Sequence, residues 1–69
     1  MPARAETMLT AAHAVADYGR IHASDDAMSM LCRRADTSEA YGGDGLIFRF
    51  DDGSKLLVCP HMAVVAQAV

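Results

Sequence analysis

The sequence has no tryptophan, two phenylalanines, two tyrosines and two cysteines among its 69 residues. Thirteen residues are alanine, which favours helix but buries little apolar area. A chain this short buries only about 60% of the surface that it exposes when unfolded. This composition excludes a second core and predicts one small domain over residues 1–69, supported by a disulfide, a metal or self-association.

Long apolar runs are also missing. The N-terminal residues, MPARAETM, are polar and charged, and no stretch approaches the length of a membrane span. We therefore expect no membrane partner and a cytoplasmic location. Cys32 and Cys59 could form one disulfide at most, and we expect free thiols because disulfides are rare in the reducing cytosol.

Positive charge is scarce: the chain has nine acidic residues and six Lys and Arg, for a net charge of −3. The segment from Asp17 to Asp52 contains eight of the acidic residues and four Arg. A nucleic-acid-binding protein needs a basic face to neutralise phosphates, and Arg33-Arg34 is the only adjacent pair of cations. The balance predicts no direct binding of nucleic acid, and either a protein partner or a plain solvated surface.

The strongest structural signal is the stretch LIFRFDDGSKLLVC, residues 46–59. Two apolar runs around an Asp-Gly step predict a β-hairpin. A two-residue turn at Asp52-Gly53 would pair Phe48 with Leu57, whereas a three-residue turn with Gly53 in a bulge would pair Phe48 with Leu56. We favour the second, because Asp-Asp-Gly suits two right-handed residues followed by a left-handed one.

Two amphipathic segments precede the hairpin. Residues 3–18 are predicted to form the first helix, because apolar residues recur at three- and four-residue spacing (Met8, Ala12, Val15 and Ala16). This helix ends at Gly19 in a left-handed cap, or continues through Gly19 to Ala23 at a cost of about 1 kcal/mol. Ser24 or Asp25 caps a second helix, whose body is Ala27–Ala35.

The remaining segments flank the hairpin. Residues 36–45, DTSEAYGGDG, predict a loop with at most a single turn. Pro60 suits the first position of a helix, so residues 61–69 predict a short helix that is apolar nearly all round. The expected fold is therefore α+β, with two N-terminal helices, one antiparallel hairpin and a short C-terminal helix. A second copy of the chain is one candidate for covering the apolar surface that these elements leave exposed.

Two sets of residues could carry chemistry. Soft metal donors are available for one zinc ion, but their spacing matches no recognised ligand pair; they are His13, His22, Cys32, Cys59 and His61. Cys59 precedes the expected C-terminal helix and lies near His61, as a reactive thiol does, yet no third group, oxyanion motif or cleft accompanies it. We expect no enzyme activity, no metal and no cofactor.

The acidic residues sit at helix caps and turns, where capping and turn chemistry explain them. Alternatively, they form a surface that docks on a basic groove of another protein. On this second interpretation the protein-binding residues are Asp25, Asp26, Asp44, Asp51 and Asp52. A winged-helix DNA-binding protein has a similar order of elements, but acidic residues at the wing tip would repel phosphate.

In size, acidic charge and helix-plus-hairpin plan, the whole chain resembles the small inhibitors carried by phages and mobile elements, including anti-CRISPR proteins. The resemblance carries no motif and assigns no residue. It implies a non-enzymatic inhibitor that binds and blocks a larger protein or nucleoprotein complex. The alternative is a small structural or regulatory subunit, such as a homodimer, assembled through the apolar C-terminal helix.

Overall fold

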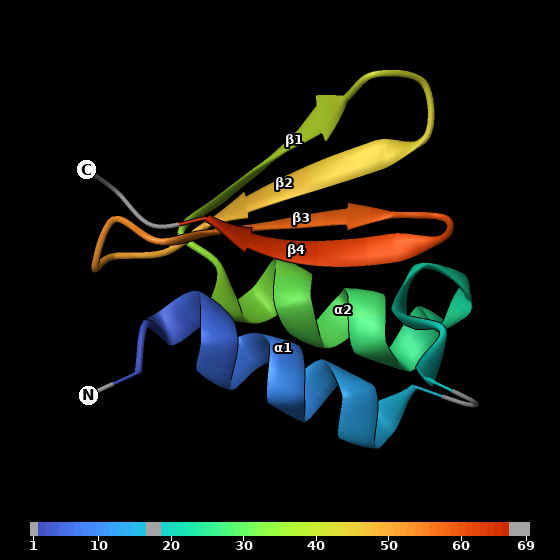
Figure 1. Cartoon of the computed structure of the whole chain (residues 1–69), viewed down its shortest axis with the longest axis horizontal. Coiled ribbons are helices and arrows are strands. Elements are labelled where there is room, and N and C mark those ends of the chain that lie inside the picture. The colour runs from blue at the N-terminus through green and yellow to red at the C-terminus, as the bar shows by residue number, and fades with distance from the viewer. Residues whose placement is uncertain (1, 17–18, 67–69) are drawn as a thin grey trace.

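A computed structural model describes residues 2–16 and 19–66. Two helices form one layer that lies on one face of a four-stranded antiparallel sheet with strand order β1-β2-β3-β4 (Figure 1). The elements in chain order are α1 (Arg4–Val15), the 3-10 turn η2 (Ile21–Ala23), α2 (Asp25–Arg34), β1 (Thr37–Tyr41), β2 (Gly45–Arg49), β3 (Lys55–Cys59) and β4 (Met62–Ala66).

The first helix is shorter than its apolar spacing predicts. Helix α1 ends at Val15, and Ala16 already has an extended backbone, so the prediction of a helix continuing to Ala23 is wrong. Gly19 does adopt a left-handed conformation, with φ of 69°, but it lies beyond the helix end. Val15, predicted to lie on the buried stripe, is exposed. Residues 17–18 of the predicted helix lie outside the described residues.

The second helix follows its local signals. Ser24 is the N-cap of α2, and its Oγ accepts a hydrogen bond from the Ala27 backbone N–H at 3.2 Å. This bond satisfies one of the amide groups that lack an intrahelical partner. The prediction of a cap at this point is confirmed, and the helix runs from Asp25 to Arg34.

The central hairpin has the predicted register. Phe48 lies across from Leu56, and Gly53 has φ of 87°. The Phe50 N–H donates to the Ser54 carbonyl at 3.0 Å, and the Gly53 N–H donates to the Phe50 carbonyl at 3.1 Å. These bonds close a three-residue turn ending in a left-handed glycine, as expected.

The segment predicted to be a loop is a strand instead. Strand β1, TSEAY, pairs with all of β2, from Thr37 opposite Arg49 to Tyr41 opposite Gly45. All five of its residues are exposed, because β1 is an edge strand that projects beyond the helices (Figure 1). A strand that is exposed on both faces needs no alternation of apolar residues, so its sequence carries no strand pattern.

The C-terminal segment is also a strand, and the predicted helix over residues 61–69 is wrong. Pro60 and His61 form a turn, and β4 pairs with β3 from Cys59 opposite Met62 to Lys55 opposite Ala66. Pairing satisfies the backbone groups along the outer edge of β3, and the two valines of β4 suit a strand. Residues 67–69 of the predicted helix lie outside the described residues.

The core lies between the helices and the inner face of the sheet, which is the face they cover. Phe48, Leu56 and Val58 on this face are fully buried, and Leu31 of α2 packs in the same cluster. The buried positions of α1 are mostly alanines, and their small side chains allow close approach between elements. One helical layer thus closes one face of the sheet and leaves the other uncovered.

Candidate functional site

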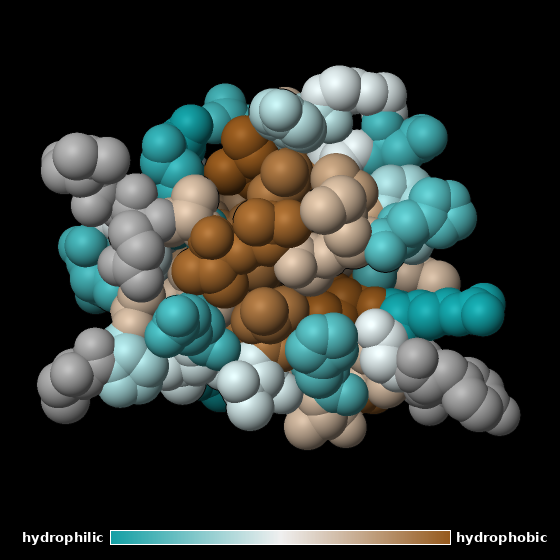
Figure 2. Space-filling view, viewed as in Figure 1, coloured by the Kyte–Doolittle hydropathy of each residue, from teal (hydrophilic) through white to brown (hydrophobic). Residues whose placement is uncertain are grey.

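The candidate site is the open face of the sheet, opposite the helical layer. Ile47, Leu57 and Val64 lie directly across from one another on β2, β3 and β4 and form an apolar row on this face. Ile47 and Leu57 are half-buried by their neighbours, and Val64 is 39% exposed. Figure 2 shows apolar side chains gathered over the strands in the middle of the molecule, with polar side chains around them.

A second row continues the apolar surface toward one end of the sheet. Tyr41 and Met62 are 53% and 59% exposed, and half-buried Cys59 lies between them. Gly45 keeps these strands close together, because a Cβ there would lie 2.8 Å from the Tyr41 carbonyl oxygen and 3.3 Å from the Cys59 Sγ. The two rows together make a contiguous apolar area across all four strands.

Polar side chains border the other end of this face. The Arg49 guanidinium donates from Nη2 and Nε to the Glu39 Oε1, at 2.6 and 3.0 Å. Lys55 lies across from Arg49 on β3. Glu39 is the only carboxylate on this face among the described residues, and Arg49 compensates its charge. The open face therefore carries no excess of negative charge, although the whole chain has a charge of −3.

The five acidic residues predicted to bind a partner do not form one surface. Asp25 and Asp26 lie in the first turn of α2, and Asp44 lies in the β1–β2 turn, where its carbonyl accepts a hydrogen bond from His22 Nε2 at 2.7 Å. Asp51 and Asp52 lie in the β2–β3 turn, at the opposite end of β2. A five-residue strand, roughly 16 Å long, separates the two groups.

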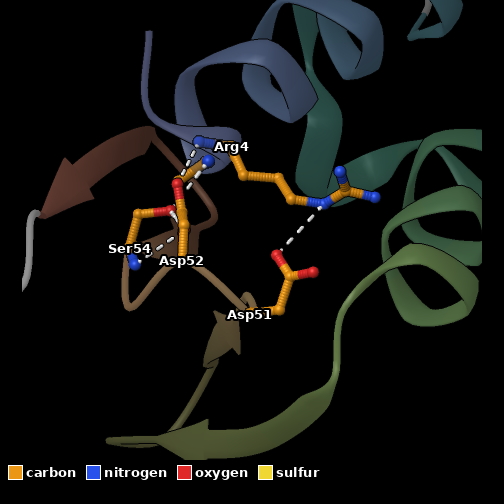
Figure 3. A network of polar contacts seen from close by, with 5 residues as sticks. Arg4, Asp51, Asp52 and Ser54 are labelled. Carbon is orange, nitrogen blue, oxygen red and sulfur yellow. Dashed lines mark hydrogen bonds and ion pairs between the residues drawn. The ribbon is translucent and has the colours of Figure 1, made fainter. Parts of the chain in front are cut away.

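Asp52 and Ser54 hold the start of α1 against the β2–β3 turn (Figure 3). The Arg4 backbone N–H donates to Asp52 Oδ2 at 2.7 Å, and the Ala5 N–H donates to the buried Ser54 Oγ at 3.0 Å. Ser54 in turn donates from its hydroxyl and its backbone N–H to Asp52 Oδ1. The local N-cap residue, Ala3, makes no side-chain hydrogen bond, so this turn caps α1 from 48 positions away.

These hydrogen bonds also change the acidity of Asp52. The Ser54 hydroxyl, followed by the Arg4 and Ser54 backbone N–H groups, lowers the pKa of Asp52 from 3.8 to about 2. Each donor stabilises the ionised carboxylate. Neighbouring Asp51 makes an exposed ion pair with the Arg4 Nε at 3.7 Å, which contributes little to stability. Asp52 is therefore engaged in holding the fold, whatever partner the turn meets.

The sites considered for metal or thiol chemistry gain no support from the geometry. Within residues 2–16 and 19–66, no three His, Cys, Asp or Glu side chains are grouped so that they could hold a metal ion. Cys32 and Cys59 are both free thiols. The segment after Cys59 is a strand and not the predicted helix. No helix N-terminus therefore follows this thiol to activate it.

The apolar residues of the open face were not among the predicted site residues. A signal was present, because positions on both faces of the predicted hairpin are apolar and the segment MAVVA is apolar all round. Such a pattern requires cover on two sides. The structure supplies cover on one side only.

Comparison of the chain with protein-family models, with curated proteins and with solved structures gives no match. In the part of the chain that the structure describes, every helix is too short or too polar to cross a bilayer.

Proposed function

We propose that the protein is a non-enzymatic module that binds a larger protein through the open face of its sheet and thereby inhibits it. The observation that carries the proposal is the uncovered apolar row of Ile47, Leu57 and Val64. Small monomeric proteins rarely leave a contiguous apolar surface without a use, and such surfaces mark interaction sites.

The size of the open face favours a larger partner over a second copy. Four strands of five residues cover a plane of roughly 16 by 19 Å, or about 300 Å². A stable complex buries about 800 Å² on each partner. Even if the uneven surface of the side chains doubled this area, the area buried on each of two copies packed face to face would stay below about 800 Å². A larger protein can also surround β1, whose five residues are all exposed.

The charges around the face indicate the chemistry of the partner. Asp44 lies in the turn at one end of the sheet and Asp51 in the turn at the other, whereas Asp25 and Asp26 lie in the helical layer. A partner with an apolar groove edged by Lys and Arg would complement both features, and such complementarity raises association rates and specificity. Asp52 lies in the same turn as Asp51 but is engaged in its bonds to α1.

Inhibition is the part of the proposal that rests on the resemblance to anti-CRISPR proteins and related phage inhibitors. A small, rigid domain that occupies a groove blocks it without chemistry of its own. We place this action in the cytoplasm, because both cysteines are free thiols, as is usual in a reducing compartment.

A homodimer through the same face is the second candidate. It is favoured by the absence of excess negative charge on the described strands of that face, since Arg49 compensates Glu39 and only Lys55 remains charged there. The predicted route through a C-terminal helix does not exist, and β4 would contribute Met62 and Val64 instead.

The proposal is tested by affinity capture from a bacterial lysate with the tagged wild type and two lysine variants. Leu57→Lys places a charge in the centre of the open face, and Ser29→Lys places the same charge on the exposed surface of α2. We expect one stoichiometric protein, identified by mass spectrometry, that the wild type and Ser29→Lys retain and Leu57→Lys loses. The purified partner should then lose its own activity when the wild type is added.

Two results would overturn the proposal. One is a partner retained equally by all three proteins, which would place the binding surface elsewhere. The other is a wild-type dimer in sedimentation equilibrium that Leu57→Lys converts to the 7.4 kDa monomer, which would show that a second copy occupies the face.

A further inference from the structure

All three histidines of the chain line one pocket. The elements that carry them come together at the end of the molecule where α1 ends and β3 turns into β4 (Figure 1). A pocket of about 520 Å³ opens there between the end of α1, the segment 19–23 and the β3–β4 turn. The side chains that give it chemical character are His13, Arg20, His22, Cys59, His61 and Met62. Its volume falls in the range of small-molecule sites, about 300–1,000 Å³.

The charged residue in the described lining of this pocket is opposite in sign to the net charge of the chain. Its lining includes one arginine and three histidines and, within residues 2–16 and 19–66, no aspartate or glutamate. The whole chain has nine acidic residues against six Lys and Arg. One guanidinium and three imidazoles, drawn from three separate segments, thus line one cavity of an acidic protein.

The imidazoles are placed so that they present hydrogen-bonding atoms. His22 Nε2 donates to the Asp44 carbonyl oxygen at 2.7 Å, because a carbonyl can only accept, and this bond fixes the orientation of the His22 ring at the pocket wall. His13 Nδ1 lies near Gly19, 3.7 Å from where a Cβ on that residue would stand. Small Gly19 therefore leaves the His13 ring room at the pocket wall.

We propose that this pocket binds a small molecule bearing a phosphate group. A phosphate has several acceptor oxygens and suits donors that converge from different directions, and a guanidinium binds it with two parallel hydrogen bonds. The apolar remainder of the lining, including Ile21 and Pro60, suits the organic part of a phosphate monoester. The pocket shares Cys59 and Met62 with the end of the open face, but its Arg20 and histidine side chains give it a different chemistry, and the proposal does not depend on the proposed partner.

The test is isothermal titration calorimetry on the full chain with inorganic phosphate, adenosine monophosphate, adenosine and sulfate. We expect adenosine monophosphate to bind more tightly than inorganic phosphate, sulfate to bind as an anion of the same shape, and adenosine not to bind. Arg20→Gln and His61→Gln, both at exposed residues, should each weaken phosphate binding at least tenfold.

Arg33→Gln on α2 removes the same charge away from the pocket and should leave the affinity unchanged. Equal weakening by Arg33→Gln would show an unspecific charge effect and overturn the proposal. Failure of both phosphates and sulfate to bind would also overturn it, as would binding of adenosine as strong as that of its phosphate.

Discussion

The two faces of the sheet are made by the same strands and by similar side chains, yet they differ in cover. On the inner face, Phe48, Leu56 and Val58 are completely buried beneath the helices. On the open face, Ile47 and Leu57 are half-buried, and Val64 is more than one-third exposed. The chain closes its core without the open-face residues, so their apolar character is available for a partner.

Two single lysine substitutions in β3, one on each face of the sheet, should show the difference between the faces most strongly. Val58→Lys puts an ammonium group into the core, where no partner can compensate the lost hydration, and we expect the chain not to fold. Leu57→Lys, one residue earlier, should cost at most about 1 kcal/mol, because its long side chain can reach water.

Circular dichroism and urea unfolding of the two variants provide the measurement. Similar losses of stability from both substitutions would show that the open face is as important to the fold as the inner one. That result would contradict the distinction between the two faces.

The cover over the inner face depends on the anchor between α1 and the β2–β3 turn. Ser54→Ala leaves the Ala5 N–H without its buried acceptor and should lower the free energy of unfolding by about 1–3 kcal/mol. For a chain of this size the melting temperature should fall by about 4–8 °C for each kcal/mol. The matched change Ser29→Ala, at an exposed site on α2, should stay within about 0.5 kcal/mol. Equal effects would mean that Ser54 does not anchor the helix.

The same anchor should make the covered face sensitive to acid. Because the pKa of Asp52 is lowered from 3.8 to about 2 in the folded protein, its ionisation stabilises the fold above pH 3.8. This contribution is lost as the pH falls through 2. Asp52→Asn should flatten the dependence of stability on pH between these values, and Ser54→Ala should reduce it, since the Ser54 hydroxyl has the largest effect on that pKa. Unfolding curves that keep the wild-type slope in Asp52→Asn would contradict this role.

Local signals allowed part of the fold to be predicted. The Asp-Asp-Gly turn fixed the pairing of Phe48 with Leu56, and Ser24 marked the start of α2, because turns and caps depend on a few adjacent residues. Strand β1 could not be recognised, since an exposed edge strand needs no apolar pattern. The segment MAVVA fits a helix or a strand, and only pairing with β3 decides between them.

The candidate site was harder to predict for the same reason. Asp52 was predicted as a partner-binding residue, but its bond to the Arg4 backbone N–H connects residues that are 48 positions apart in the sequence. The open face was hidden because apolar residues on both sides of a strand do not reveal which side the helices cover. Distribution of the acidic residues between two ends of the sheet likewise follows from the topology and not from their positions in the sequence.

The central claim is that the partner contacts the open face and not the helical layer. NMR cross-saturation tests it most directly, with the isotope-labelled chain bound to the unlabelled partner identified by affinity capture. The account predicts that saturation passes from the partner to the methyl groups of Ile47, Leu57 and Val64 and spares those of Leu31, Leu56 and Val58. Saturation that instead reaches exposed Val15 on α1, with the open-face methyl groups unaffected, would contradict it.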